Sequence, residues 1–409
     1  MRRSSMSSLP ALVALFAALG CSSTTEPGRP AERTALPRPL TSAERAVIDA
    51  GNDFSWALLR QLSAEQRGTT VVVSPLSASM ALGMTLNGAA GPTFDGMRAT
   101  LGLGAAPLAD INAGYKASIA LLRDLDPTVD FRLANSIWHD ARFPFHQSFL
   151  DAGRQWFDAE IRAVDFASPA AAASMNDWVK QATGGRIPSI VESTRDEVMY
   201  LINTIYFKGK WRDEFDPAKT RDGEFRAADG SRQAAKLMHR SGSIPYVADA
   251  EVVGATLPYG NAAFAMTILM PRDAATSIDA FAEGLTAAKW RQWTEGMRPS
   301  GMDLDLPRFT ITYERKLNDD LAALGMADAF SPARADFSRL SPQGVFLSVV
   351  KQKTFIQVNE EGTEAAAATA VGVTPTSLPP TFRVDRPFVF VIHERLSGTV
   401  LFVGKVAKL

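Results

Sequence analysis

Cysteine is almost absent from this sequence, because Cys21 is the only one among 409 residues. A single cysteine cannot form an intramolecular disulfide, and a domain that follows it has no thiol for catalysis or for a metal site. Histidine is nearly as scarce, and none of the four stands at a metal-ligand spacing such as HExxH. We therefore expect no metal and no cofactor, and a fold that is stabilised by packing.

An excess of charge of one sign is also missing. The net charge is -1 at pH 7, so no strong field exists to attract nucleic acid or an anionic membrane. Neither a G-x-S-x-G elbow nor a P-loop occurs. A catalytic triad whose residues are scattered along the chain is the one enzymatic arrangement that the sequence does not exclude. No motif supports an enzyme. Hydrophobic residues make up 46% of the chain, which is enough for a large core.

The N-terminus has the pattern of an export signal. Two arginines precede Leu9–Leu19, an apolar run of 11 residues. This run is shorter than the roughly 20 residues that cross a bilayer and is typical of a signal-peptide core. It ends in Ala-Leu-Gly-Cys21, which resembles a bacterial lipobox with its Leu one place late. The resemblance implies a signal peptide over residues 1–20 and a lipid on Cys21, and an ordinary secretory signal is the alternative.

The next segment is rich in Ser, Thr and Pro and lacks an apolar period. We therefore expect residues 21–40 to be a lipidated linker that holds a domain off a membrane. The protein is then exported as a membrane-anchored lipoprotein that faces the periplasm or the cell exterior, or else it is secreted. No membrane contact is expected except through the N-terminal lipid.

Residues 41–409 are predicted to form one α+β domain. Helical spacing dominates the first half and strand-like runs dominate the second, without the alternation of a βαβ fold. A cap at Thr41 or Ser42 and the Ser74-Pro75 pair each open a helix. Further helices are expected at Ser148–Glu160 and Ser174–Gln181, and strands at Val71–Val73, Val198–Phe207, Phe264–Met270, Val345–Val358, Val384–Ile392 and Val400–Val406.

The most informative stretch lies between Val358 and Pro380. Two acids and a glycine lead into a run of small residues, and the run ends in a proline-rich turn. In a strand, successive side chains point to opposite faces. Neither proline nor charge occurs between Ala365 and Thr374, so no ladder hydrogen bond would be lost. We predict an exposed loop that later enters a sheet, with one face of small residues: Thr363, Ala365, Ala367, Thr369 and Val371.

Several ordered motifs from Thr41 to Leu409 resemble the serpin family. Phe382–Ile392 matches its C-terminal signature, Asn203–Trp211 matches the strand that leads to its breach, and Ser74–Ser77 matches its shutter. The resemblance implies the serpin fold, a single α+β domain with three β-sheets, about nine helices and an exposed reactive-centre loop over residues 360–380. The inhibitory hinge of the family is matched by Glu360, Glu361, Gly362, Thr363, Glu364, Ala365, Ala366, Ala367 and Ala368.

The resemblance also implies a set of shutter and breach residues. The set comprises Ser74, Ser77, Asn203, Trp211 and Gln352. The family carries a histidine where Gln352 stands. A glutamine can still donate and accept hydrogen bonds to Asn203 and a serine hydroxyl. Its geometry differs from that of histidine, so the sequence does not determine how much free energy opening the main sheet requires. Trp211 also suits a plain core role.

A suicide-inhibition mechanism follows from the resemblance. A serine protease attacks the loop as a substrate and becomes acylated, and the cleaved loop then enters the main sheet of the monomeric inhibitor. Family spacing places the bond at Thr376–Ser377, 14 residues beyond Gly362 and 11 before Pro387. Because Thr376 is small and uncharged, we expect elastase- or subtilisin-like targets.

Two plainer interpretations stay open. A serpin fold can lack inhibition and act as a binding or structural protein, although such members carry bulky or charged hinge residues. The alanines also suit a flexible linker or a short helix. The alternation of small residues on one face favours the inhibitory interpretation over both.

Overall fold

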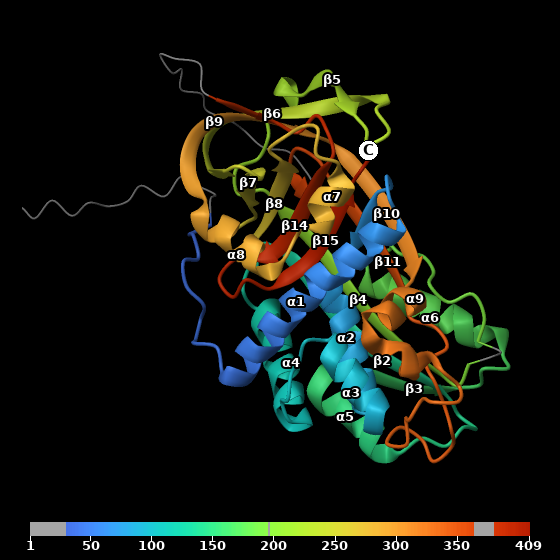
Figure 1. Ribbon diagram of the computed structural model, residues 1–409. Coiled ribbons are helices and arrows are strands. Elements are labelled where there is room, and N and C mark those ends of the chain that lie inside the picture. The colour runs from blue at the N-terminus through green and yellow to red at the C-terminus, as the bar shows by residue number, and fades with distance from the viewer. Residues whose placement is uncertain (1–29, 195–196, 364–379) are drawn as a thin grey trace, which may run out of the picture.

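Nine α-helices and three β-sheets form the part of the chain that the computed structural model describes, residues 30–194, 197–363 and 380–409 (Figure 1). This arrangement confirms the predicted α+β architecture. Within the same residues no helix is both long and apolar enough to cross a bilayer. The helices are α1 (Ser42–Glu65), α2 (Pro75–Leu86), α3 (Gly91–Thr100), α4 (Leu108–Arg123), α5 (Gln147–Phe157), α6 (Pro169–Ala182), α7 (Ile278–Glu283), α8 (Ala287–Gly296) and α9 (Asn318–Leu321).

The largest sheet has nine strands and contains most of the core. Its order is β1 (Val71–Val73), β15 (Val400–Val406), β14 (Phe388–Glu394), β8 (Phe264–Pro271), β7 (Val252–Pro258), β6 (Arg232–Ala248), β9 (Arg298–Pro307) and β13 (Thr381–Arg383), with β5 (Arg221–Arg226) paired to β6. Every residue of β8, β14 and β15 is buried. Such continuous apolar runs are typical of strands that are covered on both faces.

Two smaller pieces of sheet lie side by side. One has the order β12 (Gly362–Thr363), β4 (Met199–Lys210), β2 (Asp130–Asp140) and β3 (Glu160–Val164). The other is the antiparallel pair β10 (Phe309–Lys316) and β11 (Lys351–Val358). Figure 1 shows β4 and β11 as neighbouring strands of different pieces, with α2 beside both.

Local sequence signals set several of these boundaries. Thr41 caps α1 through a capping box with Glu44, and Ser74 caps α2 with Pro75 in the first turn. Two expected helices have shifted ends. Helix α5 ends at Phe157, because Asp158 is left-handed with φ 50°. Helix α6 begins five residues earlier than expected, at Pro169 after a capping serine.

The expected strand Val345–Val358 forms only in its second part. Residues 345–350 lie outside any strand, because other chain segments hold their backbone groups. The Leu347 N–H donates to Ala329 O (2.9 Å), the Val350 N–H donates to Asn318 Oδ1 (2.8 Å), and Asn318 also donates to Ser348 O (2.7 Å).

Residues 30–40 contact the body of the domain, which corrects the expectation that the linker extends to residue 40. The Arg33 N–H donates to Asn261 O (2.7 Å), and Arg212 donates to Pro30 O (2.9 Å). Leu36 packs against the core. A free tether forms no such contacts, so the ordered domain begins no later than residue 30.

We expect the pair of Arg38 and Glu44 to stabilise this attachment. Both guanidinium nitrogens of Arg38 donate to the buried Glu44 carboxylate, at 2.6 and 2.7 Å. Arg38→Ala leaves that carboxylate with the bond from the Thr41 N–H (2.8 Å) and should lower the unfolding free energy by about 1–2 kcal/mol. Arg154→Ala, which removes an exposed pair with Asp151, should change it by less than about 0.5 kcal/mol. Urea denaturation of both variants checks this, and equal effects would contradict it.

Candidate functional site

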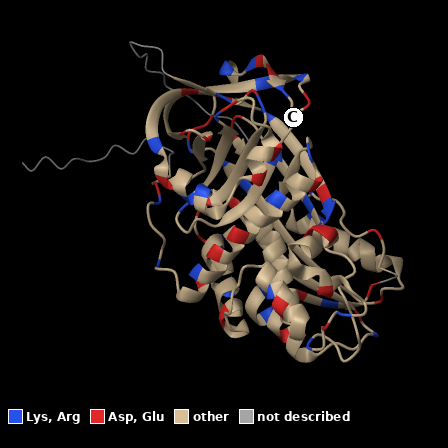
Figure 2. Ribbon diagram, in the orientation of Figure 1, with Lys and Arg blue, Asp and Glu red and all other residues tan. Residues whose placement is uncertain are grey.

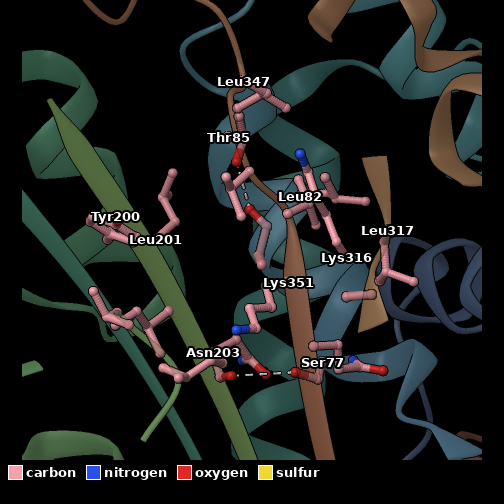
Figure 3. Close-up of a pocket in the computed structure, with 18 of the residues that line it drawn as sticks. Ser77, Leu82, Thr85, Tyr200, Leu201, Asn203, Lys316, Leu317, Leu347 and Lys351 are labelled. Carbon is pink, nitrogen blue, oxygen red and sulfur yellow. Dashed lines mark hydrogen bonds between the residues drawn. The ribbon is translucent and has the colours of Figure 1, made fainter. Parts of the chain in front are cut away.

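A cavity of about 470 Å³ separates strands β4 and β11. Strand β4 pairs with β2 on one side, and β11 pairs with β10 on one side. Among the described residues no ladder joins β4 to β11. We call this cavity the gap. Figure 3 shows residues from β4, from α2 and from the segment before β11 around it, with Asn203 and Ser77 at one end. Along the cavity, the gap is therefore bounded by two backbone edges that have no neighbouring strand among the described residues.

Gly362 and Thr363 of the hinge lie beyond one end of the gap, further along β4. Gly362 and Thr363 form β12 and pair antiparallel with Lys210 and Gly209 of β4. Gly362 has φ 147°, and a Cβ there would lie 2.0 Å from Gly209 O, so only glycine fits. Thr363 is 2% exposed. The first residue of the predicted small face is therefore already buried in the uncleaved chain.

Trp211 has a specific role at this end of the gap beyond filling the core. Its indole N–H donates to Asn359 O (2.9 Å), and its backbone N–H donates to Glu361 O (2.7 Å). The ring stacks on Tyr259, with centroids 4.5 Å apart and planes 13° from parallel. The Tyr259 hydroxyl lies 2.9 Å from Thr363 Oγ1. Trp211 and Tyr259 thus hold the chain on both sides of the hinge glycine.

Glu360 fixes the base of the hinge to the neighbouring strands. Its carboxylate is almost fully buried and accepts a hydrogen bond from Arg308 Nε at 2.6 Å and another from Thr220 Oγ1. Burial raises the pKa of the Glu360 carboxyl, but the hydrogen bonds from Arg308 and Thr220 outweigh it, so this pKa lies below its ordinary value. The Phe215 N–H also donates to Glu360 O (2.8 Å).

Ser74 and Gln352 form a close pair in the lining of the gap. Gln352 Oε1 accepts from the Ser74 N–H (2.9 Å), and Gln352 Nε2 donates to Ser74 O (2.7 Å). The Ser74 hydroxyl donates to Leu401 O (2.7 Å). In the described structure, Gln352 thus bonds to the backbone of Ser74 and not to the Asn203 side chain or to a serine hydroxyl. The oxygen and the nitrogen of the Gln352 side-chain amide both find hydrogen-bond partners on the Ser74 backbone.

Asn203 lies across the gap and faces β2 instead. Its Nδ2 donates to Asn135 Oδ1 (2.5 Å), and its Oδ1 is buried without a hydrogen-bond partner in the described structure. Ser77 Oγ reaches the backbone oxygen of Asn203 at 3.5 Å. The shutter residues are thus close together, but no side-chain bond joins Gln352 to Asn203.

Several predicted residues lie outside the described part of the chain. These are Cys21, Glu364, Ala365, Ala366, Ala367, Ala368, Thr376 and Ser377. Within the described ranges, no group of three His, Cys, Asp or Glu side chains could hold a metal ion. The lipid site and the reactive bond therefore stay predictions.

Sequence reasoning missed three residues that hold the hinge. Tyr259, Arg308 and Thr220 all contact hinge side chains, although each lies 52 or more residues away in sequence. Tyr259 follows an apolar strand and looks like an ordinary core residue there. Glu360 is the one residue near the hinge that indicates such partners, because a carboxylate that becomes buried needs a hydrogen-bond donor.

The fold and the gap agree with one protein family, and the chain belongs to it. The family described as "Serpin (serine protease inhibitor)" matches residues 49–409. Among relatives, the chain is similar to the leukocyte elastase inhibitor of Bos taurus, with 34% identity over 376 residues, which is 88% of this chain and 98% of that protein. The leukocyte elastase inhibitor of Homo sapiens is 33% identical over 377 residues, with the same two coverages.

Solved structures show the same likeness. The native state of the thermophilic serpin tengpin aligns with a TM-score of 0.82 and 29% identity, covering 93% of this chain and 97% of that one. Thyroxine-binding globulin in complex with thyroxine aligns with a TM-score of 0.80 and 26% identity, covering 88% and 98%. The predicted serpin fold is confirmed. The two relatives are vertebrate proteins and lend no support to a bacterial origin.

We expect the contact between Arg308 and Glu360 to stabilise the intact protein in a pH-dependent way. A lowered carboxyl pKa means that the stabilisation is complete above the unfolded value of about 4.3 and is lost as the pH falls through the folded value. Arg308→Ala should lower the unfolding free energy at pH 7 by about 1–2 kcal/mol, which is seen as a lower melting temperature. The effect is limited to this size because the Arg308 side chain is partly exposed to solvent. Arg308→Lys should retain part of the effect.

Thermal melts of wild type and both variants, from pH 7 towards pH 3.5, measure this contact. The difference between wild type and Arg308→Ala should shrink on acidification. A difference that stays constant across this range would show that the carboxylate charge of Glu360 does not carry the stabilisation.

Proposed function

We propose that this protein inhibits serine proteases as a suicide substrate whose cleaved loop enters the gap between β4 and β11. The observation that carries the proposal is β12, which places Gly362 and Thr363 in antiparallel register on β4. From this start, the chain that follows Thr363 can continue along β4 as a strand in the same register. The family match to serine protease inhibitors supports the same conclusion.

The register extends over the whole of β4. If Thr363 stays opposite Gly209, each further residue of the loop meets the preceding residue of β4, and Val373 comes opposite Met199, the first residue of that strand. Pro375 then lies just beyond the strand, where a missing N–H costs no ladder bond. The proline-free, charge-free part of the loop therefore matches the length of β4.

The side-chain faces also match. Residues directly opposite each other in an antiparallel pair share a face. Thr369 would come opposite Asn203, whose buried Oδ1 has no hydrogen-bond partner among the described residues. A threonine hydroxyl can donate to that oxygen. Insertion would thus satisfy a polar atom that the uncleaved structure leaves unpaired.

The energy of insertion is adequate for trapping an enzyme. About a dozen new strand residues, at roughly 1 kcal/mol of net stabilisation per hydrogen bond, yield on the order of 10 kcal/mol. A protease domain is stable by about 5–15 kcal/mol. Pulling an acylated protease against the body of the inhibitor can therefore distort the active site of that protease.

The target class follows from the residue before the bond. We place the reactive bond at Thr376–Ser377, and Thr376 fits a small specificity pocket better than one built for Arg, Lys or a large ring. Elastase- or subtilisin-like proteases are the favoured targets. The name of the relatives, leukocyte elastase inhibitor, supports the elastase-like class. We also propose that the protein acts as an exported monomer held to a membrane through a lipid on Cys21.

A binding role is the second candidate. The solved thyroxine-binding globulin, which resembles this chain, is described in complex with a small ligand. The hinge of small residues favours inhibition instead, because insertion needs side chains that can be buried. A denaturing gel separates the two functions, since only an inhibitor leaves an acyl complex that survives denaturation.

We predict that mixing the protein with an elastase-like protease yields such a complex. The released C-terminal peptide should begin at Ser377, which mass spectrometry identifies. A peptide that begins at another residue would refute the assigned bond. Cleaved chain without any complex would refute inhibition, and fast inhibition of trypsin alone would refute the target class.

Thr363→Arg should turn the inhibitor into a substrate. The side chain at this position is buried against Tyr259, and a large charged group there opposes burial of the first inserted residue. Glu364→Arg is the matched control, because the next residue of a strand points to the opposite face. The measured quantity is the fraction of chain that ends in the complex. Equal fractions for the two variants would contradict the proposed register.

A further inference from the structure

A buried carboxylate joins four strands of the nine-stranded sheet. The Asp305 side chain of β9 is fully buried, and one of its oxygens accepts hydrogen bonds from Arg383 Nε of β13 (2.9 Å) and from Arg221 of β5 (2.5 Å). Its other oxygen lies 2.9 Å from Nδ1 of His239 on β6. Burial raises the pKa of the Asp305 carboxyl, but the bonds from His239 and Arg383 and the charge of Arg221 outweigh it, so this pKa lies below its ordinary value. Asp305 is therefore an ionised partner for His239.

This carboxylate selects one tautomer of the His239 ring. An ionised carboxylate can only accept hydrogen bonds, so the proton of the neutral ring is on Nδ1 and Nε2 carries the lone pair. Ser241 Oγ lies 3.5 Å from that Nε2. A carboxylate on Nδ1 and a serine hydroxyl at Nε2 are the contacts of a nucleophilic triad, which is recognised by geometry and not by sequence position. The fold thus brings together the kind of scattered triad that the sequence does not exclude.

The Ser241 hydroxyl is exposed and has a second acceptor. It donates to Asp303 Oδ1 at 2.5 Å. In the pairing of β6 with β9, Ser241 lies opposite Asp303 and His239 lies opposite Asp305, so the four side chains form two adjacent rows on one face. The contact between Ser241 and His239 is long, as catalytic hydrogen bonds often are before a substrate binds. Asp303 therefore competes with His239 for the hydroxyl proton.

We propose that Ser241 is a nucleophile that accepts acyl groups from small activated esters and phosphonyl groups from phosphonyl fluorides, with His239 as its general base. Ser241 Oγ bonds to the carbonyl carbon or to the phosphorus, and its proton passes to His239 Nε2. The alcohol or fluoride of the reagent leaves, and His239 returns the proton to it or to water. Asp305 is a positioning residue that holds the ring. Because Ser241 is exposed, water solvates the developing oxyanion, and the reaction is slower than in an enclosed site.

The test uses the intact protein, without any protease, and a fluorophosphonate probe that bonds to activated serine hydroxyls with loss of fluoride. Wild type should become labelled, and peptide mapping by mass spectrometry should place the label on Ser241. Ser241→Ala should lose it. His239→Gln should label at least about ten-fold more slowly, because general-base assistance contributes roughly 10²–10⁴-fold. Melting temperatures of all variants show whether the fold is retained.

Ser243→Ala provides a matched control. Ser243 is also exposed and lies two residues further along the same face of β6, but it is opposite Gly301. Its loss should leave the label on Ser241 at the wild-type rate. Asp303→Ala should label faster than wild type, because the Ser241 hydroxyl then has His239 as its remaining acceptor of the two.

Asp305→Asn tests the positioning role. Wild-type labelling should rise with pH over the range of about 5–8 in which histidine loses its proton. Asp305→Asn should shift this rise to lower pH, because the ionised carboxylate that favours a protonated ring is gone, while Arg221, Arg383 and Asp303 remain around it. A purely structural role would lower the melting temperature without moving the pH dependence.

Each other outcome overturns the inference. A wild type that takes up no label, or takes it up at another residue, would show that Ser241 is not a nucleophile. Equal rates for wild type and His239→Gln would show that His239 is not its base. Slower labelling in Asp303→Ala would show that Asp303 takes the proton instead. A protein that is labelled on Ser241 but forms no complex with a protease would refute the proposed function and leave this inference standing.

Discussion

Two facing strand edges without a partner are the constraint on which the rest of this structure depends. An edge presents N–H and C=O groups that cost free energy when they are buried and unpaired. Strands β4 and β11 each present such an edge to the gap. The fold tolerates this because each strand is fixed from elsewhere. Strand β4 has a ladder of ten residue pairs to β2, and β11 has one of eight pairs to β10.

The two ends of the gap differ in a way that gives strand entry a direction. At the hinge end, the Trp211 and Tyr259 rings and the buried Glu360 carboxylate hold the chain where it leaves β11. Away from the hinge, the gap is lined by side chains of α2, of β4 and of residues 345–350. A strand that continues β12 therefore extends from a fixed start into an unoccupied region. Figure 2 shows charged residues of both signs interspersed along the elements on this face.

Features that follow from local physics could be predicted from the sequence. The caps at Thr41 and Ser74 and the strand Val71–Val73 depend on a few adjacent residues. The burial of Thr363 also agrees with the two-residue period of the loop. Features that depend on distant partners could not be predicted. The amide of Gln352 could be expected to form hydrogen bonds, but its choice of the Ser74 backbone over Asn203 depends on how far apart β11 and β4 lie.

The loss of strand at residues 345–350 and the docking of residues 30–40 have the same explanation. In both segments the backbone partners lie far away in sequence, on Asn318 and Ala329 for the first and on Asn261 for the second. No local period encodes such contacts. The described core explains why they matter little for the fold. Strand β14 pairs with β8 on one side and with β15 on the other, with one register irregularity at Ile392/His393, and none of these three strands borders the gap between β4 and β11. A change in the gap therefore adds ladder bonds without breaking those of the core. That is the condition for a large gain in stability from a local movement.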